Sequence, residues 1–357
     1  MLLRELQIKN FRCFESKVIN LNSKIVLIEG ENGVGKSSIL EALHYLCYLR
    51  SFRTYAPKEL IHFESDNFFL KVVVENALCA QDELKVGFSG KKKTVKINEV
   101  AVPSFRELFE SYRIITVTDD DLSLIKGTPE ERRAFLDQFI LLCAPEYLDM
   151  LKKFKHILDS RNALLASKRV SRSNYDIWTK QLWESSIVIQ RFRADKLRIL
   201  NDIVSDLVNV HFGEEITIEL GYKVKKGSLN EDFDGFLQKN HELFDLELRF
   251  ERSCFGAHLD DISIIFKDQK SKQFASRGQQ KLILLLLKVA QVKNILAQKG
   301  GVIFLLDDVM SDFDEKVLKT ILDILIELDI QLILTSPVVN KGVEKHLPEG
   351  ILKKIQI

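Results

Sequence analysis

The stretch Gly30-Glu31-Asn32-Gly33-Val34-Gly35-Lys36-Ser37 matches the phosphate-loop pattern Gly-x-x-x-x-Gly-Lys-Ser in full. It follows residues 24–29, a short apolar run typical of a buried strand, and from Ser37 onward apolar residues recur at helical spacing. A phosphate loop has to lie between a strand and a helix, so this order argues against a chance match. The stretch therefore predicts a nucleotide site in which backbone N–H groups curl around the phosphates.

The side chains of this loop predict ATP and Mg²⁺ as cofactors. Lys36 is expected to reach the β- and γ-phosphates, and Ser37 Oγ is expected to ligate Mg²⁺. The predicted nucleotide-binding residues are Gly30, Glu31, Asn32, Gly33, Val34, Gly35, Lys36, Ser37 and Ser38.

A pair of acids follows the apolar run Val302–Leu306. Asp307 is expected to ligate Mg²⁺ together with Ser37, and Asp308 is then free to polarise the attacking water. With Lys36 they form the predicted catalytic set. A strand that ends in a solvated acidic turn is the alternative, but the presence of both motifs weakens it.

A third motif, Ser276–Lys281, opens a predicted helix over residues 278–298. A helix N-terminus attracts anions, and ABC-type ATPases use one as a signature that clamps the γ-phosphate bound to the opposite subunit. Alone, the string could be only a helix cap with Ser276 at the N-cap. Its place just before the acidic strand favours a signature acting in trans, made of Ser276, Arg277, Gly278 and Gln279. Ser311 and Asp314 then fall where the subunit-bridging loop of such ATPases lies.

Length and composition limit the number of domains and the class of protein. The 357 residues suggest two domains, and a hydrophobic fraction of 46% is ordinary for a globular protein. Net charge is +1, which speaks neither for nor against a nucleic-acid partner. The 5 cysteines have no metal-ligand or redox spacing, which favours reduced thiols. With no secretory signal at the start and no apolar stretch of membrane-spanning length, we expect a cytoplasmic protein without a membrane partner.

Hydrophobic periodicity predicts an α/β fold. Strands are expected at 2–11, 24–29, 68–75, 84–88, 94–97, 215–220, 261–266, 302–306 and 330–335. Residues 129–213 have helical periodicity, with breaks near 144–145 and 167–174, and a further helix is expected at 315–328. We therefore predict a discontinuous ATPase head, residues 1–125 and 250–357, with an inserted and mostly helical arm domain at 126–249.

Strings along nearly the whole chain resemble the RecF family, whose ATPase head is similar to those of Rad50 and SMC proteins. The matching segments are Leu6–Phe14, Arg50–Thr54, Asp121–Gly127, Pro129–Asp137, Arg161–Leu165, Ser276–Lys281 and Asp307–Ser311. Their order and the chain length also agree. The resemblance implies an ABC-type, Rad50/SMC-head-like P-loop ATPase.

Several positions depart from the family pattern. Gly256–Asp261 replaces the usual Gly-Pro-His-Arg-Asp-Asp, and within it His258 is expected to be structural. Arg277 stands where glutamine is common, and Asp119 roughly occupies the place of the Q-loop glutamine. The histidine that follows the last strand in related heads is replaced by Thr335 and Ser336. The resemblance also offers two roles for Arg12, a phosphate contact or a surface salt bridge.

The family implies a function in DNA replication, DNA repair, recombination and the SOS response. ATP would join two copies head to tail, and slow, DNA-stimulated hydrolysis would release them, so that ATP acts mainly as a dimerisation switch. The homodimer would bind double-stranded DNA at single-strand gaps and, with RecR and RecO, help to load RecA onto DNA coated with SSB.

Basic residues are the predicted DNA contacts, because Lys and Arg bind phosphates without reading sequence. The candidates are Arg50, Arg53, Lys91, Lys92 and Lys93. For the lysine triple, a solvated hairpin tip is an equal alternative.

Two other functions share parts of this pattern. The head of another SMC-like DNA-maintenance protein would be favoured by sustained heptads with a Cys-x-x-Cys hook or by an appended nuclease domain, and the sequence has neither. A small-molecule kinase could use the same phosphate loop, but it would need no signature motif and no acid pair like Asp307-Asp308.

Overall fold

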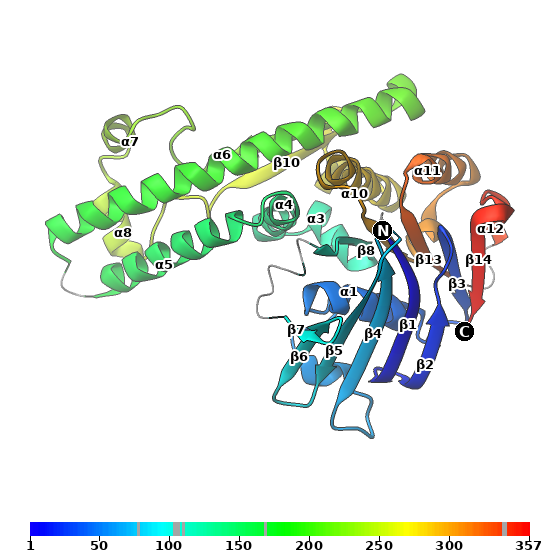
Figure 1. Cartoon of the computed structure of the whole chain (residues 1–357). Helices are drawn as coiled ribbons and strands as arrows, with labels where there is room; N and C mark the ends of the chain where they lie inside the picture. Colours follow the sequence, from blue (N-terminus) through cyan, green and yellow to red (C-terminus); the bar gives the residue numbers. More distant parts are fainter. Residues whose placement is uncertain (77–78, 103–107, 109–110, 168–169, 338–340) are drawn as a thin grey trace. The chain divides into compact units, whose positions relative to one another are not determined.

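The computed structural model describes residues 1–76, 79–102, 108, 111–167, 170–337 and 341–357, without the side chains of residues 299, 341 and 342 (Figure 1). The chain forms two compact units, one from Met1–Asp121 with Arg277–Ile357 and one from Leu122–Ser276. The first unit is therefore built from both ends of the sequence. The boundaries differ from the expected 125/126 and 249/250. The larger difference, at 276/277, arises because the strand at Asp261–Phe266 pairs within the second unit.

The first unit contains two sheets. One has six strands in the order β2-β1-β4-β5-β6-β7, with antiparallel neighbours. Its strands are β1 (Leu2–Phe11), β2 (Phe14–Asn20), β4 (Phe68–Glu75), β5 (Gln81–Phe88), β6 (Lys93–Ile97) and β7 (Val100–Ala101). The other is fully parallel, in the order β14-β3-β13-β12-β8. Its strands are β3 (Ile25–Gly30), β8 (Ile114–Val117), β12 (Ile303–Asp307), β13 (Gln331–Pro337) and β14 (Leu352–Gln356).

Helix α1 (Lys36–Tyr48) contacts both sheets: β1, β4 and β5 of the first, and β3, β8 and β12 of the second. This explains why almost every side chain of the helix is buried, whereas a surface helix buries one stripe. Helices α10 (Arg277–Lys299), α11 (Glu315–Glu327) and α12 (Lys341–Lys345) complete the unit. The apolar run Leu282–Leu287 lies in α10 and is buried along its whole length.

The second unit is mainly helical, and α6 is its longest element (green in Figure 1). Its helices are α3 (Ser123–Lys126), α4 (Pro129–Cys143), α5 (Tyr147–Ala166), α6 (Arg172–His211), α7 (Phe233–Lys239), α8 (Leu243–Phe250) and α9 (Ser271–Phe274). Its antiparallel sheet has the order β11-β10-β9, formed by β9 (Ile218–Lys223), β10 (Asp261–Phe266) and β11 (Gln269–Lys270). Helix α6 packs against α4, α5 and β9.

The predicted breaks in the helical stretch lie at the α4–α5 and α5–α6 connections, although residues 168–169 of the second are outside the described residues. The strands at 2–11, 68–75 and 261–266 are confirmed at the predicted bounds. The strand predicted at 215–220 begins later, at Ile218, after a short 3-10 helix. Among the described residues, no helix is both long enough and apolar enough to cross a membrane.

Candidate nucleotide site

The candidate site lies where three neighbouring parallel strands end. β13 pairs with β3 on one side and with β12 on the other, so the carboxyl ends of all three strands lie at one edge of the sheet. The register places Asp307 of β12 opposite Thr335 of β13, and Gly30 of β3 opposite Pro337. The phosphate loop and the acid pair are therefore brought together by strand pairing, although they are far apart in sequence.

The phosphate loop joins β3 to α1 through two glycines in the left-handed region. Gly33 has φ 87° and Gly35 has φ 104°. A Cβ on Gly35 would lie 2.5 Å from Cys13 Sγ and 2.6 Å from the Phe14 ring, so this position also excludes larger residues sterically. The loop leads directly into the N-terminus of α1, which favours binding of an anion such as phosphate.

Lys36 is held across this loop. Its Nζ donates hydrogen bonds to the backbone oxygens of Gly30, at 2.7 Å, and Glu31, at 2.8 Å. The side chain is buried, so its charge is directed into the loop rather than into solvent. Phosphate oxygens are stronger acceptors for an ammonium than neutral carbonyls are, so the arrangement fits a lysine that reaches phosphate.

The two predicted Mg²⁺ ligands are in direct contact. Ser37 Oγ donates to Asp307 Oδ1 at 2.9 Å. Thr335 Oγ1 donates to the same oxygen at 2.9 Å, which leaves Asp307 Oδ2 free of these two bonds. Mg²⁺ in nucleotide sites takes one or two protein oxygens, waters and substrate phosphates, and this hydroxyl–carboxylate pair fits that donor set.

Thr335 also fixes the next acid. The backbone N–H of Asp308 donates to Thr335 Oγ1 at 2.9 Å, and Asp308 adopts φ 48°. Burial raises the pKa of the Asp308 carboxyl above its usual range, and Asp307 adds to the rise while Lys281 opposes it. A carboxylate with a raised pKa is suited to accept a proton. No role for Thr335 was predicted from the sequence.

The residues predicted to form the signature lie at the start of α10, where the second unit ends and the first resumes in sequence. Ser276 is exposed and is the last residue of the second unit, while Arg277 is the first residue of the helix and of the resumed first unit. Gly278 lies close to the backbone, because a Cβ there would be 3.4 Å from the oxygen of Asp312. Gln279 is half-buried.

An ionic cluster ties the start of α10 to two acids. Lys281, only 2% exposed, has its Nζ 2.8 Å from Asp119 Oδ1 and 2.8 Å from Asp312 Oδ2. Arg277 reaches the same carboxylates at 3.1 and 3.2 Å. The hydrogen bond from Lys281 lowers the pKa of Asp312. Sequence reasoning assigned no role to Lys281 or Asp312, since nothing in their spacing signals that they meet.

The residues proposed for the subunit-bridging loop have local partners. Ser311 Oγ donates to the backbone oxygen of Asp308 at 3.1 Å. Asp314 is the N-cap of α11 and accepts from the N–H of Val317 at 2.9 Å. Within one chain, Asp314 therefore stabilises a helix end.

Arg12 forms a salt bridge, but its partner is buried rather than on the surface. Its Nε and Nη2 donate to the two carboxylate oxygens of Glu41 at 2.8 and 2.6 Å. Glu41 belongs to α1 and is fully buried, and Arg12 Nη1 also donates to the oxygen of Glu59 at 3.1 Å. The predicted phosphate contact of Arg12 stays a prediction beside this bidentate ion pair, and Glu41 was missed because its neighbours in α1 are apolar.

Comparison with known proteins identifies the family to which this architecture belongs. The family model described as RecF/RecN/SMC N terminal domain matches residues 2–346. The DNA replication and repair protein RecF of Leptospira interrogans is 32% identical, over 91% of this chain and 89% of the relative. The chain belongs to the RecF family. The RecF of Natranaerobius thermophilus is 31% identical, over 94% of this chain and 91% of that protein.

Solved structures show the shared fold. The ATP-bound structure of the recombination mediator protein RecF in the RecFOR pathway has a TM-score of 0.82 and 24% identity, covering 94% of this chain and 92% of that one. The Smc head domain of Pyrococcus furiosus has a TM-score of 0.57 and 16% identity, covering 99% and 93%. The expected ABC-type head fold is confirmed.

The basic residues predicted to bind DNA in the RecF resemblance lie on two neighbouring segments. Lys93 Nζ donates to the oxygen of Leu49 at 2.8 Å and lies 5.2 Å from the Tyr45 ring centroid, and burial lowers its pKa. This contact places the β5–β6 hairpin beside the end of α1, where Arg50 and Arg53 follow. Lys91 and Lys92 are exposed at the hairpin tip.

The loop that departs from the RecF pattern, Gly256–Asp261, is part of a packed interior. Asp260 is fully buried and accepts hydrogen bonds from Gln190 Nε2 at 2.8 Å and Tyr222 OH at 2.7 Å. Burial lowers the pKa of His258 to about 4, which keeps the imidazole neutral, as expected for a structural histidine.

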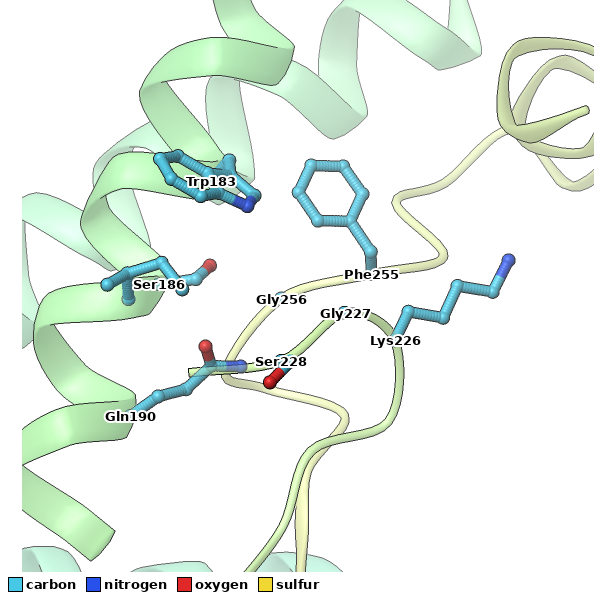
Figure 2. A pocket seen from close by; sticks show the side chains of 9 residues that line it. Trp183, Ser186, Gln190, Lys226, Gly227, Ser228, Phe255 and Gly256 are labelled. Carbon is cyan, nitrogen blue, oxygen red and sulfur yellow. The ribbon is translucent and has the colours of Figure 1, made fainter. Parts of the chain in front are cut away.

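Figure 2 shows the small cavity beside this loop, with Trp183, Ser186 and Gln190 of α6 on one side and Phe255 and Gly256 on the other. Its volume of about 10 Å³ has room for about one water molecule. The cavity is too small for a nucleotide or a peptide side chain.

Proposed function

We propose that this chain is an ATP-dependent, DNA-binding recombination mediator of the RecF kind. It dimerises on ATP, binds duplex DNA at gaps and, with RecR and RecO, helps to load RecA onto SSB-coated single strands. The observation that carries the ATP part is the contact between Ser37 and Asp307, because it joins the phosphate loop to the acidic strand end. The curated relatives named as DNA replication and repair proteins support the DNA part.

In this proposal the strand ends hold Mg-ATP. Lys36 exchanges its two carbonyl partners for the β- and γ-phosphates, and Ser37 with Asp307 provides oxygens for Mg²⁺. Asp308 orients the attacking water and accepts its proton, while Thr335 keeps both acids in place. The ATP in the solved RecF structure supports this assignment.

The signature of a second copy completes the site. Ser276 and Arg277–Gln279 open α10, whose N-terminus attracts negative charge. In the proposed dimer they face the γ-phosphate bound to the other copy, with Ser311 and Asp314 near the dimer axis. ATP serves mainly to join the copies, and its hydrolysis, which is slow, separates them.

The DNA-binding part can be tested by fluorescence anisotropy with a gapped duplex, with and without ATP. We expect tight binding only with ATP, and we expect charge reversal at Arg50, Arg53, Lys91 and Lys92 to weaken it strongly, since each lost phosphate contact removes affinity. Lys152→Glu in α5, an exposed position, is the matched control. Equal binding by the charge-reversed variant would refute the mapping, and absence of ATP-dependent binding by the wild type would refute the function.

A further inference from the structure

The segment between α1 and β4 displays two aromatic side chains to solvent. Tyr55 is 87% exposed and Phe63 is 85% exposed, the two largest values among the exposed large hydrophobic side chains of the described residues. Burying a ring of this size against a partner recovers hydrophobic free energy that the exposed ring forgoes.

The segment is fixed rather than loosely attached. Ser51 Oγ accepts from the N–H groups of Arg53, at 2.8 Å, and Thr54, at 3.1 Å. Farther along, the N–H of His62 donates to the oxygen of Asn10 at 2.9 Å. Ser51 Oγ also donates to Glu41 of α1, so Tyr55 is carried by a backbone tied to α1 and β1, and binding there requires little additional ordering.

The surroundings of the two rings differ in charge. The Arg50 guanidinium lies 4.9 Å from the Tyr55 ring centroid, so a cation supports one face of a ring that is otherwise open. Arg53 and Lys58 are exposed on the same segment together with one acid, Glu59, which accepts a hydrogen bond from Thr54 Oγ1. Phe63, in contrast, is followed by the exposed acids Glu64 and Asp66.

The basic environment of Tyr55 extends to the hairpin. The contact from Lys93 Nζ to the Leu49 oxygen places Lys91 and Lys92 next to the segment that carries Arg50. An open aromatic ring among cations suits a partner with π-faces and negative charges, which is the chemistry of a single nucleic-acid strand.

We propose that Tyr55, supported by Arg50, stacks against an unpaired nucleobase, so that this surface binds the single-stranded part of a gapped DNA. Stacking tolerates any base, and Arg53 with the hairpin lysines contacts the phosphates. The inference rests on the proposed DNA-binding function and adds which part of the DNA meets this surface.

The experiment measures binding of the full chain, with saturating ATP, to fluorescein-labelled oligo-dT and to a blunt duplex of the same length. Tyr55→Ala should weaken oligo-dT binding about tenfold and leave duplex binding within about twofold, because one stacked base is lost. Tyr55→Trp should retain wild-type binding to oligo-dT. Phe63→Ala is the matched control, equally exposed but in an acidic setting, and should leave both affinities unchanged.

Three results would overturn the inference: equal oligo-dT binding by Tyr55→Ala, equal losses for oligo-dT and duplex, or the same loss in Phe63→Ala. If the wild type binds gapped DNA while Tyr55→Ala binds oligo-dT normally, only this inference fails. If the wild type binds no DNA with ATP, the proposed function fails with it. Unchanged DNA affinities combined with lost association of Tyr55→Ala with RecR would instead assign the surface to a protein partner.

Discussion

The nucleotide site and the interior of the second, mainly helical unit are both polar, but they differ in how readily their hydrogen-bond partners can be exchanged. In the helical unit, Arg161 and Glu247 are fully buried and paired at 2.5 and 3.0 Å. Glu247 also accepts from Tyr175 OH and from the N–H of Cys254, each at 2.7 Å. Apart from Arg161 Nε, which is buried and has no hydrogen-bond partner among the described residues, the charged groups are held by fixed partners of the interior, and the network serves the fold.

At the nucleotide site the partners are exchangeable. Lys36 is bonded to neutral carbonyls, and Asp307 accepts from two hydroxyls that can rotate toward a cation or a phosphate. Two features distinguish the functional polar cluster from the structural one: its hydrogen bonds can be replaced, and it lies at strand ends. The number of charges does not distinguish the two.

Lys36→Ala is expected to distinguish the two regions most strongly, because it should affect ATP hydrolysis but hardly affect stability. ATP hydrolysis should fall to background, because the cation that neutralises the transferred phosphate is lost. The free energy of unfolding should change by no more than about 1 kcal/mol, since only two carbonyl contacts disappear. Steady-state phosphate release and urea unfolding test this, with Lys152→Ala as the control. Hydrolysis at the wild-type rate would contradict the site.

Glu247→Ala should have the opposite effect, lowering stability while leaving nucleotide binding intact. Removing this carboxylate leaves Arg161 as an uncompensated buried charge, which costs about 3–5 kcal/mol of stability. Binding of a fluorescent ATP analogue should persist at temperatures where the variant is folded. Glu242→Ala, at an exposed position of the same segment, should cost less than about 0.5 kcal/mol. Comparable thermal unfolding of the two variants would mean that the buried network does not stabilise the unit.

Thr335→Val sharpens the comparison within the nucleotide site. The substitution keeps the shape of the side chain but removes the bonds to Asp307 and to the N–H of Asp308. Losing about 1–2 kcal/mol of hydrogen-bond energy that holds the two acids in place should slow ATP hydrolysis by roughly 5- to 30-fold, while ATP affinity changes little. An unchanged hydrolysis rate would remove Thr335 from the account.

A pH titration of stability compares one histidine in each unit, His44 and His258. Burial lowers the pKa of His44, in α1, to about 3 and that of His258 to about 4. Both are neutral in the folded chain, whereas the unfolded chain takes up protons below about pH 6.5. Stability should therefore fall as pH drops from about 6.5 toward 4, by at most about 1.4 kcal/mol per pH unit and histidine. His258→Gln should flatten this slope, and the exposed control His241→Gln should not.

Local sequence patterns predicted much of the fold and the main motifs. Alternating side chains marked β4, whose burial alternates along all 8 residues, and the glycine pattern marked the phosphate loop. The parts that were missed depend on contacts between distant segments. Thr335 meets Asp307 only through the pairing of β12 with β13.

The same limit applies to charges and boundaries. Glu41 meets Arg12 from a position of α1 whose sequence neighbours are apolar, and Lys281 meets Asp119 although the whole second unit lies between them in sequence. The second unit extends to Ser276 because β10 pairs with β9, and its sequence alone could equally have belonged to the head. Periodicity reports which face of an element is buried, but it does not report which element covers that face.

The central claim is that ATP joins two copies, each providing Ser276 and Gly278 to the other's phosphate loop. Mass measurement by light scattering after size exclusion, with and without ATP, tests it directly on the wild type and on Ser276→Arg. The account predicts that ATP doubles the wild-type mass, while Ser276→Arg binds ATP yet keeps the mass of one chain. A wild type that stays single at saturating ATP, or a variant that dimerises equally well, would contradict it.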